Sequence, residues 1–123
     1  MPDSSTATPR VLVVEDEYLI RMLLEDMLDE LGYAVAAAVG TISEASQLAA
    51  NSEIDAAILD VNLDGQEIYP VADILAKRGL PFVFVTGYGE RSLPEPYRSR
   101  PALQKPFQSE QLKIALAGLF ARV

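Results

Sequence analysis

The chain has 123 residues, which is the length of one domain, and half of them are hydrophobic, so a core can form without cross-links. It contains no cysteine and no histidine, which excludes disulfides, thiolate and imidazole metal sites, and a phosphohistidine. The net charge of −8 disfavours nucleic acid as a partner, and no apolar run approaches the roughly 20 residues of a membrane span.

The first residues, MPDSSTATPR, lack the apolar core of a signal peptide, so we expect a cytoplasmic protein. We expect a disordered tail over residues 1–9 and a single domain over 10–123. The chain stops directly after its last predicted helix, so we expect no output module.

Strand-like and helix-like patterns alternate along the domain. The expected strands are VLVV (11–14), AVAAAV (34–39), AAILDV (56–61), FVFVT (82–86) and ALQ (102–104). The expected helices are 15–31, 41–51, 68–78 and 109–120. The alanines of 34–39 also suit a helix, and only the flanking Gly32 and Gly40 favour a strand.

The segment 87–100 is the least regular, because two prolines and two glycines make a full helix doubtful there. The stretch LDGQ (63–66) predicts a turn. The alternation as a whole predicts an α/β fold, in which a doubly wound, five-stranded parallel sheet carries helices on both faces. The fourth helix is expected to be short or irregular.

Polar residues stand where the predicted strands end. Glu15 and Asp16 follow the first strand, Asp60 lies near the end of the third, Thr86 ends the fourth, and Lys105 follows the fifth. Ligands bind beyond the carboxyl ends of the strands in a doubly wound sheet, so these residues are the candidate site.

Each of these residues also has an ordinary interpretation. The acids 15–17 would favour a helix N-terminus through its dipole, threonine is common in strands, and most lysines are solvated. Asp60 is harder to explain as a surface acid, because it follows the apolar run 56–59 and precedes Val61. The strongest argument for a site is that all five side chains fall at one edge.

Clustered carboxylates repel one another unless a hard cation lies among them, and Mg²⁺ suits such oxygen ligands. Asp16 and Asp60, with help from Glu15, would hold it. A carboxylate beside the metal can accept a phosphoryl group as an aspartyl phosphate. Lys105 would then supply further positive charge, and the Thr86 hydroxyl would donate a hydrogen bond to a phosphoryl oxygen.

Four blocks match one family in order and spacing: VLVVEDE (11–17), ILDVNLDG (58–65), FVTG (84–87) and LQKPF (103–107). The chain thus resembles the receiver domains of two-component response regulators, which implies a flavodoxin-like fold with strand order 2-1-3-4-5. The resemblance implies that Asp60 is the phosphoacceptor, and that Glu15, Asp16 and the backbone carbonyl of Asn62 are further Mg²⁺ ligands.

The resemblance also implies roles near the last two strands. Thr86 would be the switch hydroxyl, Lys105 would contact the phosphoryl group, and the Lys105–Pro106 bond would be cis. Ala102 stands where most receivers carry an aromatic switch residue. PFVFVTGYG resembles the signature of the FAT GUY subfamily, so Tyr88 is a candidate moving aromatic, with a loop tyrosine that has no switch role as the alternative.

We expect a stand-alone receiver that accepts a phosphoryl group from a histidine kinase or a histidine phosphotransfer protein. It would signal by binding an unknown downstream protein or act as a phosphate sink, without further enzymatic activity. The alternative is a pseudo-receiver that binds partners without phosphorylation. A small magnesium phosphatase is a third hypothesis, but Asn62 stands where such enzymes usually carry a second acid.

The first predicted helix has more apolar residues than one stripe needs, because Leu19, Met22 and Leu23 lie beside its main apolar face. In the receiver family this helix often docks the phosphodonor protein. The alternative is that these residues widen the stripe that faces the core.

Overall fold

The computed structural model describes residues 8–87, 93–94 and 97–120. The strands are β1 (Arg10–Val14), β2 (Ala34–Val39), β3 (Ala56–Asp60), β4 (Asn62–Leu63), β5 (Gln66–Glu67), β6 (Phe82–Thr86) and β7 (Ala102–Gln104). The helices are α1 (Tyr18–Leu31), α2 (Ile42–Asn51), α3 (Tyr69–Lys77) and α4 (Ser109–Phe120). None of the described helices is both long and apolar enough to cross a bilayer.

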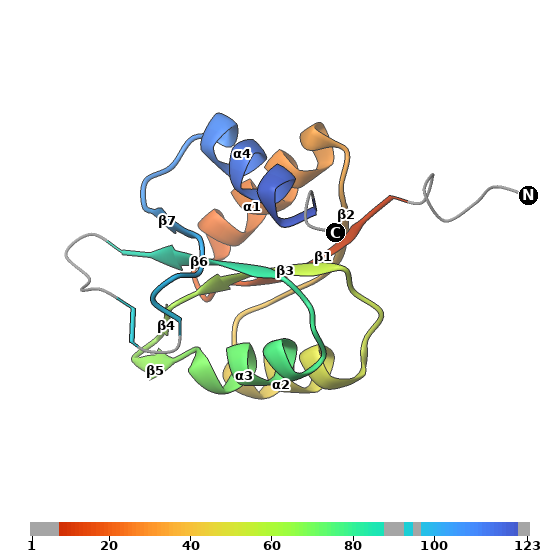
Figure 1. The fold of residues 1–123 in the computed structure, drawn as a ribbon. Coiled ribbons are helices and arrows are strands. Elements are labelled where there is room, and N and C mark those ends of the chain that lie inside the picture. Colours follow the sequence, from red (N-terminus) through yellow and green to blue (C-terminus); the bar gives the residue numbers. More distant parts are fainter. Residues whose placement is uncertain (1–7, 88–92, 95–96, 121–123) are drawn as a thin grey trace, which may run out of the picture.

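Five strands form one parallel sheet in the order β2-β1-β3-β6-β7. Helices α1 and α4 cover one face, and α2 and α3 cover the other (Figure 1). Since β6 and β7 are the fourth and fifth strands of this sheet along the chain, the predicted doubly wound fold with order 2-1-3-4-5 is confirmed.

The two central strands carry the core, which explains their unbroken apolar sequence. Every residue of β3 is buried, as are the last four of β1. Their side chains alternate between the two helical layers: Leu12 and Val14 pack in the cluster with α2 and α3, whereas Val11 and Val13 pack in the cluster with α1 and α4. This packing fixes the place where β1 and β3 end.

Strand β2 resolves the ambiguity of the alanine-rich segment 34–39. Gly32 ends α1 in the left-handed conformation with φ 92°, and the chain then turns into an edge strand that pairs with β1. All six residues of β2 are half-buried.

Helix α1 begins at Tyr18, so the expected start at residue 15 is wrong. The amide of Glu15 donates to the carbonyl of Val39 and continues the pairing of β1 with β2. The Glu15 carboxylate then accepts a hydrogen bond from the amide of Glu17 at 3.0 Å. These bonds hold the acids in a short connection between strand and helix.

The predicted turn at 63–66 forms the tip of a small hairpin, in which β4 pairs antiparallel with β5. Asp64 and Gly65 both have positive φ, at 51° and 87°. Two successive residues of this kind are typical of a type I′ turn, which Asp-Gly favours. The hairpin lies directly after Asp60.

Between β6 and β7, the described residues 93–94 and 97–100 contain no helix. Tyr97 is nonetheless buried: its ring stacks on Tyr69 and meets Phe82 and Phe84 edge to face. Its hydroxyl donates a hydrogen bond to the Asp73 carboxylate on α3. This part of the chain is therefore tied to the α3 side of the sheet.

Two predictions concern residues that the structure describes only in part or not at all. Tyr88 lies outside the described residues, so its switch role stays a prediction. Of the predicted tail 1–9, only Thr8 and Pro9 are described, and the carbonyl of Pro9 accepts a hydrogen bond from the amide of Ala34.

Candidate phosphoryl-acceptor site

Three acids meet at the carboxyl end of the sheet. Glu15 and Asp16 follow β1, Asp60 ends β3, and one carboxylate oxygen of each lies within 4.8 Å of the others. Glu15 is fully buried and Asp60 is only 4% exposed. Since buried carboxylates of like charge repel one another, the cluster requires positive charge close by.

Lys105 supplies part of that charge. Its Nζ lies 3.2 Å from Oδ2 of Asp60, 3.1 Å from Oε1 of Glu15 and 3.3 Å from Oε1 of Glu17. Glu17 was not among the predicted site residues. Its side chain is 61% exposed and joins the cluster through the contact with Lys105. The Lys105–Pro106 peptide bond is cis.

The environment shifts the pKa values of this cluster. Burial raises the pKa of Glu15 to about 7, against the opposing hydrogen bond from the Glu17 amide and with the Asp60 charge adding to the effect. Burial lowers the pKa of Lys105, but the Asp60 and Glu15 carboxylates more than offset this and raise it above its usual range. Lys105 is therefore a permanent ammonium at neutral pH.

The donor set fits a divalent cation. Oε1 of Glu15 is buried and, among the described residues, accepts no hydrogen bond, although it lies within ion-pair distance of Lys105. Three carboxylates face a single ammonium, so the cluster keeps a negative charge when ionised. Clustered carboxylate oxygens are the ligands that Mg²⁺ prefers. Glu15, Asp16 and Asp60 are the residues that would hold it.

A cleft of about 440 Å³ opens over the cluster. Its lining residues are Asp16, Glu17, Asp60, Asn62, Asp64, Gly65, Gly87 and Lys105. The amide of Asn62 donates to Oδ1 of Asp60 at 3.2 Å, and the Asn62 side-chain oxygen accepts from the amide of Gly65 at 2.7 Å. The side chain of Asn62 is thus engaged in the hairpin turn.

Thr86 precedes Gly87, which lines this cleft, and its hydroxyl is bonded toward β7. Its hydroxyl donates a long hydrogen bond of 3.4 Å to the carbonyl of Leu103, and its carbonyl accepts from the amide of Lys105 at 2.8 Å. The structure therefore brings the backbones of Thr86 and Lys105 together, with the hydroxyl turned toward β7.

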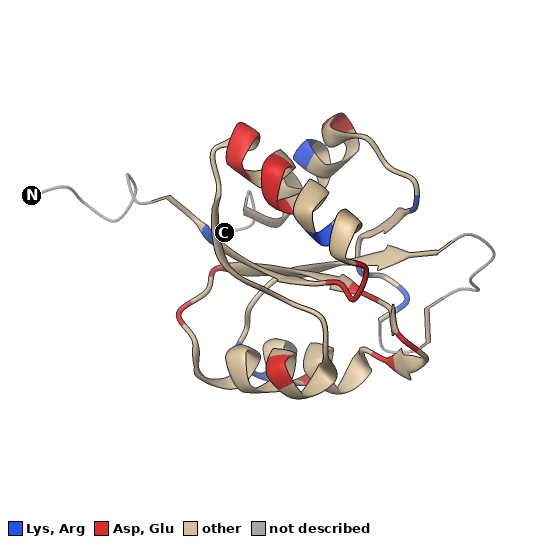
Figure 2. Ribbon diagram, turned by 180° about the vertical axis from the view of Figure 1, so that it is seen from behind, with Lys and Arg blue, Asp and Glu red and all other residues tan. Residues whose placement is uncertain are grey.

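Helix α1 carries an exposed apolar surface. Leu19, Met22 and Leu23 are 77%, 42% and 48% exposed, so the interpretation that they widen the core-facing stripe is wrong. A hollow of about 340 Å³ lies beside them; its lining residues are Ile20, Leu23, Gly87, Lys105, Pro106 and Phe107. Acidic residues also lie along α1 (Figure 2).

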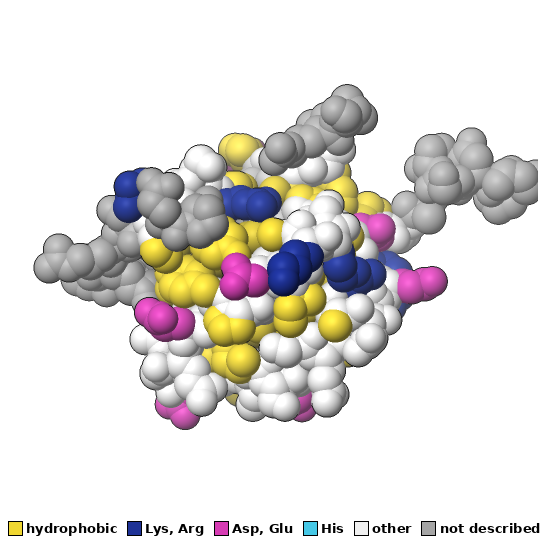
Figure 3. Space-filling view, turned by 60° about the horizontal axis from the view of Figure 1, so that its bottom comes forward, with side chains coloured by type: hydrophobic (Ala, Val, Ile, Leu, Met, Phe, Trp, Pro, Cys, Tyr) yellow, Lys and Arg dark blue, Asp and Glu magenta, His cyan; other side chains and the backbone are white. Residues whose placement is uncertain are grey.

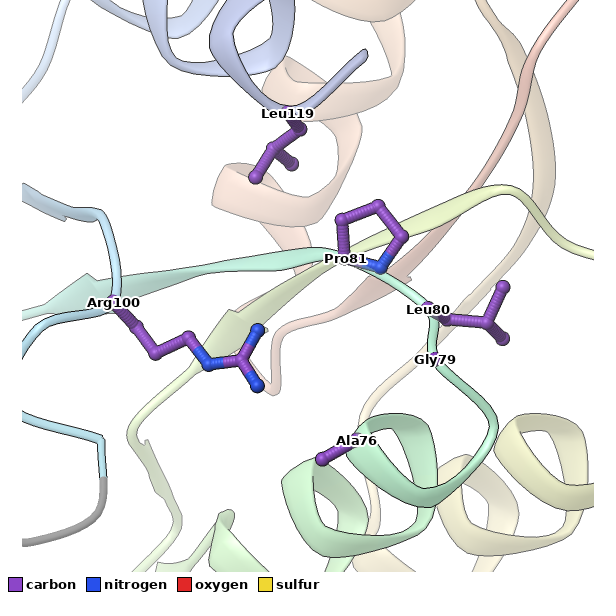
Figure 4. Close-up of a pocket in the computed structure, with 6 residues that line it drawn as sticks. All are labelled: Ala76, Gly79, Leu80, Pro81, Arg100 and Leu119. Atoms are coloured by element: carbon purple, nitrogen blue, oxygen red, sulfur yellow. The ribbon is translucent and has the colours of Figure 1, made fainter. Parts of the chain in front are cut away.

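A separate hollow of about 300 Å³ lies where β6 and β7 begin, away from the acids (Figure 4). Among its described lining residues only Arg100 is charged, and its guanidinium stands 4.4 Å from the centre of the Phe82 ring. Charged side chains of both signs are interspersed with apolar ones over the face that Figure 3 shows. The described lining of this hollow contains no acid, in contrast to the cleft at Asp60.

Comparison with known proteins agrees with the family resemblance of the sequence. Residues 11–117 match the model of the response regulator receiver domain. The chain belongs to this family. Its members share the fold described above, and the sequence-based identification is confirmed.

Two curated regulators are similar to this chain over most of its length. PdtaR, a transcriptional regulatory protein of Mycobacterium tuberculosis, is 39% identical over 93% of the chain, which spans 58% of PdtaR. The phyllosphere-induced regulator PhyR of Methylorubrum extorquens is 36% identical over 87% of the chain, which spans 42% of PhyR. The chain thus spans about half the length of these regulators.

Among solved structures, the solution structure of SdrG from Sphingomonas melonis Fr1 is 46% identical, with a TM-score of 0.84. The match covers 94% of this chain and 98% of SdrG. A BeF3-activated conformation of SdrG, attributed to Pseudomonas melonis Fr1, is 47% identical with a TM-score of 0.78, and covers 93% of this chain and 98% of that one.

Proposed function

We propose that this receiver accepts a phosphoryl group on Asp60 in a Mg²⁺-dependent reaction. The observation that supports this most is the position of Asp60: its Oδ2 lies 3.2 Å from the ammonium of Lys105, inside a cluster of three carboxylates that opens into a cleft. A nucleophile, a counter-charge and a metal-binding donor set are therefore present together.

The transfer forms a bond between a carboxylate oxygen of Asp60 and phosphorus, and breaks the P–N bond of the donor phosphohistidine. The electron pair of the broken bond returns to the donor imidazole, which takes up a proton. When bound, Mg²⁺ supplies positive charge next to the phosphoryl oxygens. Lys105 remains charged throughout and binds another of these oxygens.

Thr86 would act after the transfer. Its hydroxyl holds only a 3.4 Å bond to the Leu103 carbonyl, so rotation toward a phosphoryl oxygen exchanges a weak hydrogen bond for a charge-assisted one. The BeF3-activated conformation of SdrG supports the idea that this group of receivers responds to a phosphoryl-like ligand. The backbone carbonyl of Asn62 would complete the metal ligands from the hairpin side.

The phosphodonor would be a histidine kinase or a histidine phosphotransfer protein. The phosphorylated receiver would then bind a further protein, or it would act as a phosphate sink in a phosphorelay. The exposed apolar residues Leu19, Met22 and Leu23 of α1 offer a docking surface for the donor. Leu23 lines a hollow that shares Gly87 and Lys105 with the cleft. We propose that the chemistry of this receiver is limited to its own phosphorylation and dephosphorylation.

Intact mass after incubation with acetyl phosphate and Mg²⁺ tests the proposal. We expect a gain of one phosphoryl group that needs Mg²⁺ and is absent in Asp60→Asn. Asp64→Asn is the matched control, because Asp64 lines the same cleft without belonging to the acidic cluster, and asparagine tolerates its positive φ. Labelling of Asp60→Asn would disprove the assignment; no labelling by acetyl phosphate or a histidine kinase would indicate a module that only binds partners.

A further inference from the structure

Arg21 on α1 reaches back to the end of β1. Its Nη1 donates a hydrogen bond of 2.8 Å to the backbone carbonyl of Glu15, and the guanidinium lies 5.8 Å from the centre of the Tyr18 ring. The bond spans six residues and is partly buried. Since the carbonyl of Glu15 belongs to the peptide group that joins Glu15 to Asp16, Arg21 holds the link between two of the three clustered acids.

Gly40, which follows β2, makes room for this contact. A Cβ at this position would lie 2.6 Å from Nη1 of Arg21, 3.3 Å from Cα of Asp16 and 3.4 Å from the carbonyl oxygen of Glu15. Gly40 is not among the glycines with positive φ. Glycine is therefore needed here for space and not for backbone conformation.

The peptide groups on both sides of Glu15 are held in this way. The amide of Glu15 donates to the carbonyl of Val39, and its carbonyl accepts from Arg21. Bonds on both sides restrain the backbone at this strand end, and with it the points from which the Glu15 and Asp16 side chains reach toward Asp60. Within the described part of the chain no ion pair joins Arg21 to these carboxylates, so its effect passes through the backbone.

We propose that Arg21, seated over Gly40, is a positioning residue that orients the Glu15–Asp16 pair for the divalent cation. This inference rests on the proposed Mg²⁺-dependent function. Groups that orient metal ligands without touching the metal contribute strongly to metal affinity, and their loss weakens binding about 10- to 100-fold.

The test is a calorimetric or NMR titration with Mg²⁺ alone, without phosphodonor. We expect Arg21→Met to raise the Mg²⁺ dissociation constant about tenfold or more. Arg21→Lys keeps a donor and should restore part of the affinity. At saturating Mg²⁺, labelling of Arg21→Met by acetyl phosphate should return to the wild-type rate, because the variant alters metal binding and leaves Asp60 and Lys105 in place.

Gly40→Ala tests the same contact from the other side while keeping the arginine charge, and it should also weaken Mg²⁺ binding. Two controls match the chemistry. Arg78→Met also removes an arginine bond to a backbone carbonyl, from Nη1 of Arg78 to Ala49 at 2.5 Å, but away from the acids. Gly118→Ala adds a methyl group where nothing lies within 4 Å. Both controls should bind Mg²⁺ as the wild type does.

The outcomes separate the two proposals. Wild-type Mg²⁺ affinity in folded Arg21→Met would overturn the positioning role and leave the proposed function standing. If Arg21→Met does not fold, Gly40→Ala decides in the same way. Absence of Mg²⁺ binding by the wild-type protein would overturn the metal dependence and the positioning role together.

Discussion

The Nζ atom of Lys105 lies 3.2 Å from Oδ2 of Asp60, although Asp60 ends β3, Lys105 follows β7, and β6 separates these strands in the sheet. The same ammonium contacts Glu15 on the far side of Asp60. Lys105 thus spans the cleft and offsets the charge of the acidic cluster whenever no other cation does so. Its removal should affect both stability and chemistry.

Lys105→Met keeps the length of the side chain and removes its charge. We expect the free energy of unfolding, measured by urea in EDTA, to fall by about 1–3 kcal/mol, because Glu15 and Asp60 lose their partner. Labelling by acetyl phosphate should slow about a hundredfold, since a group that stabilises the transferring oxygens is lost. Lys113→Met on the exposed side of α4 is the control; equal labelling of both variants would refute the role of Lys105.

Thr86→Val should leave the stability of the protein nearly unchanged and weaken its conformational response to BeF3. The Thr86 hydroxyl makes only a 3.4 Å bond to the Leu103 carbonyl, so its loss should change the unfolding free energy by less than about 1 kcal/mol. Labelling of Asp60 should persist. NMR shift changes on addition of BeF3 should shrink in the residues of β6 and β7, and a full response of the variant would speak against Thr86 as the switch.

Tyr97→Phe should destabilise the protein by about 1–2 kcal/mol, because it removes the hydrogen bond to the Asp73 carboxylate and keeps the ring packing. Burial, with help from Asp73, raises the pKa of Tyr97 from 10.0 to about 12. A folded-state pKa above the unfolded value means that this stabilisation is complete below pH 10 and is lost as the pH rises toward 12.

Urea unfolding at several pH values and a tyrosine absorbance titration check this prediction. The tyrosine transition near pH 12 should disappear in Tyr97→Phe and persist in Tyr18→Phe, since Tyr18 is a residue 63% exposed in the wild type. The difference in stability between wild type and Tyr97→Phe should narrow above pH 10. A constant difference up to pH 12 would contradict the raised pKa.

Met22→Glu should slow phosphotransfer from a protein donor without changing the reactivity of Asp60. Met22 is 42% exposed on α1, so the variant should fold normally. Transfer from a cognate histidine phosphodonor should slow, because a charge enters an apolar contact, whereas labelling by acetyl phosphate should stay unchanged. Ala50→Glu at an exposed position of α2, across the sheet, is the matched control; equal transfer to both variants would argue against docking at α1.

The alternation of elements is enough to predict a parallel sheet with helices on both faces, whereas the strand order follows from the resemblance to receiver domains. The polar strand ends are enough to predict the cluster of Asp16, Asp60 and Lys105, because the carboxyl ends of parallel strands meet at one edge. The start of α1 is predicted too early. The acids 15–17 suit a helix N-terminus by dipole, and only the long-range bond from Glu15 to Val39 shows that the pairing of β1 with β2 extends to residue 15.

Other features could not be predicted, because they depend on tertiary contacts between residues that are far apart in the sequence. Tyr97 lies in an irregular segment rich in proline and glycine, yet it packs against three aromatic rings from β6 and α3. The contact of Arg21 with Glu15 needs Gly40, which stands nineteen positions away from Arg21 and by its local sequence indicates only a strand boundary. The rotamer of Thr86 is set by the Leu103 carbonyl of a neighbouring strand.

The residues of the site come from strands that differ in how deeply they are buried. Asp60 and the acids near it emerge from β3 and β1, the fully enclosed strands, whereas Lys105 follows β7, an edge strand of three residues with only Leu103 buried. Amide hydrogen exchange should therefore be slowest in β1 and β3 and fastest along β7. The proposed acceptor Asp60 thus belongs to the most enclosed part of the sheet, whereas Lys105 follows the strand that should open most readily.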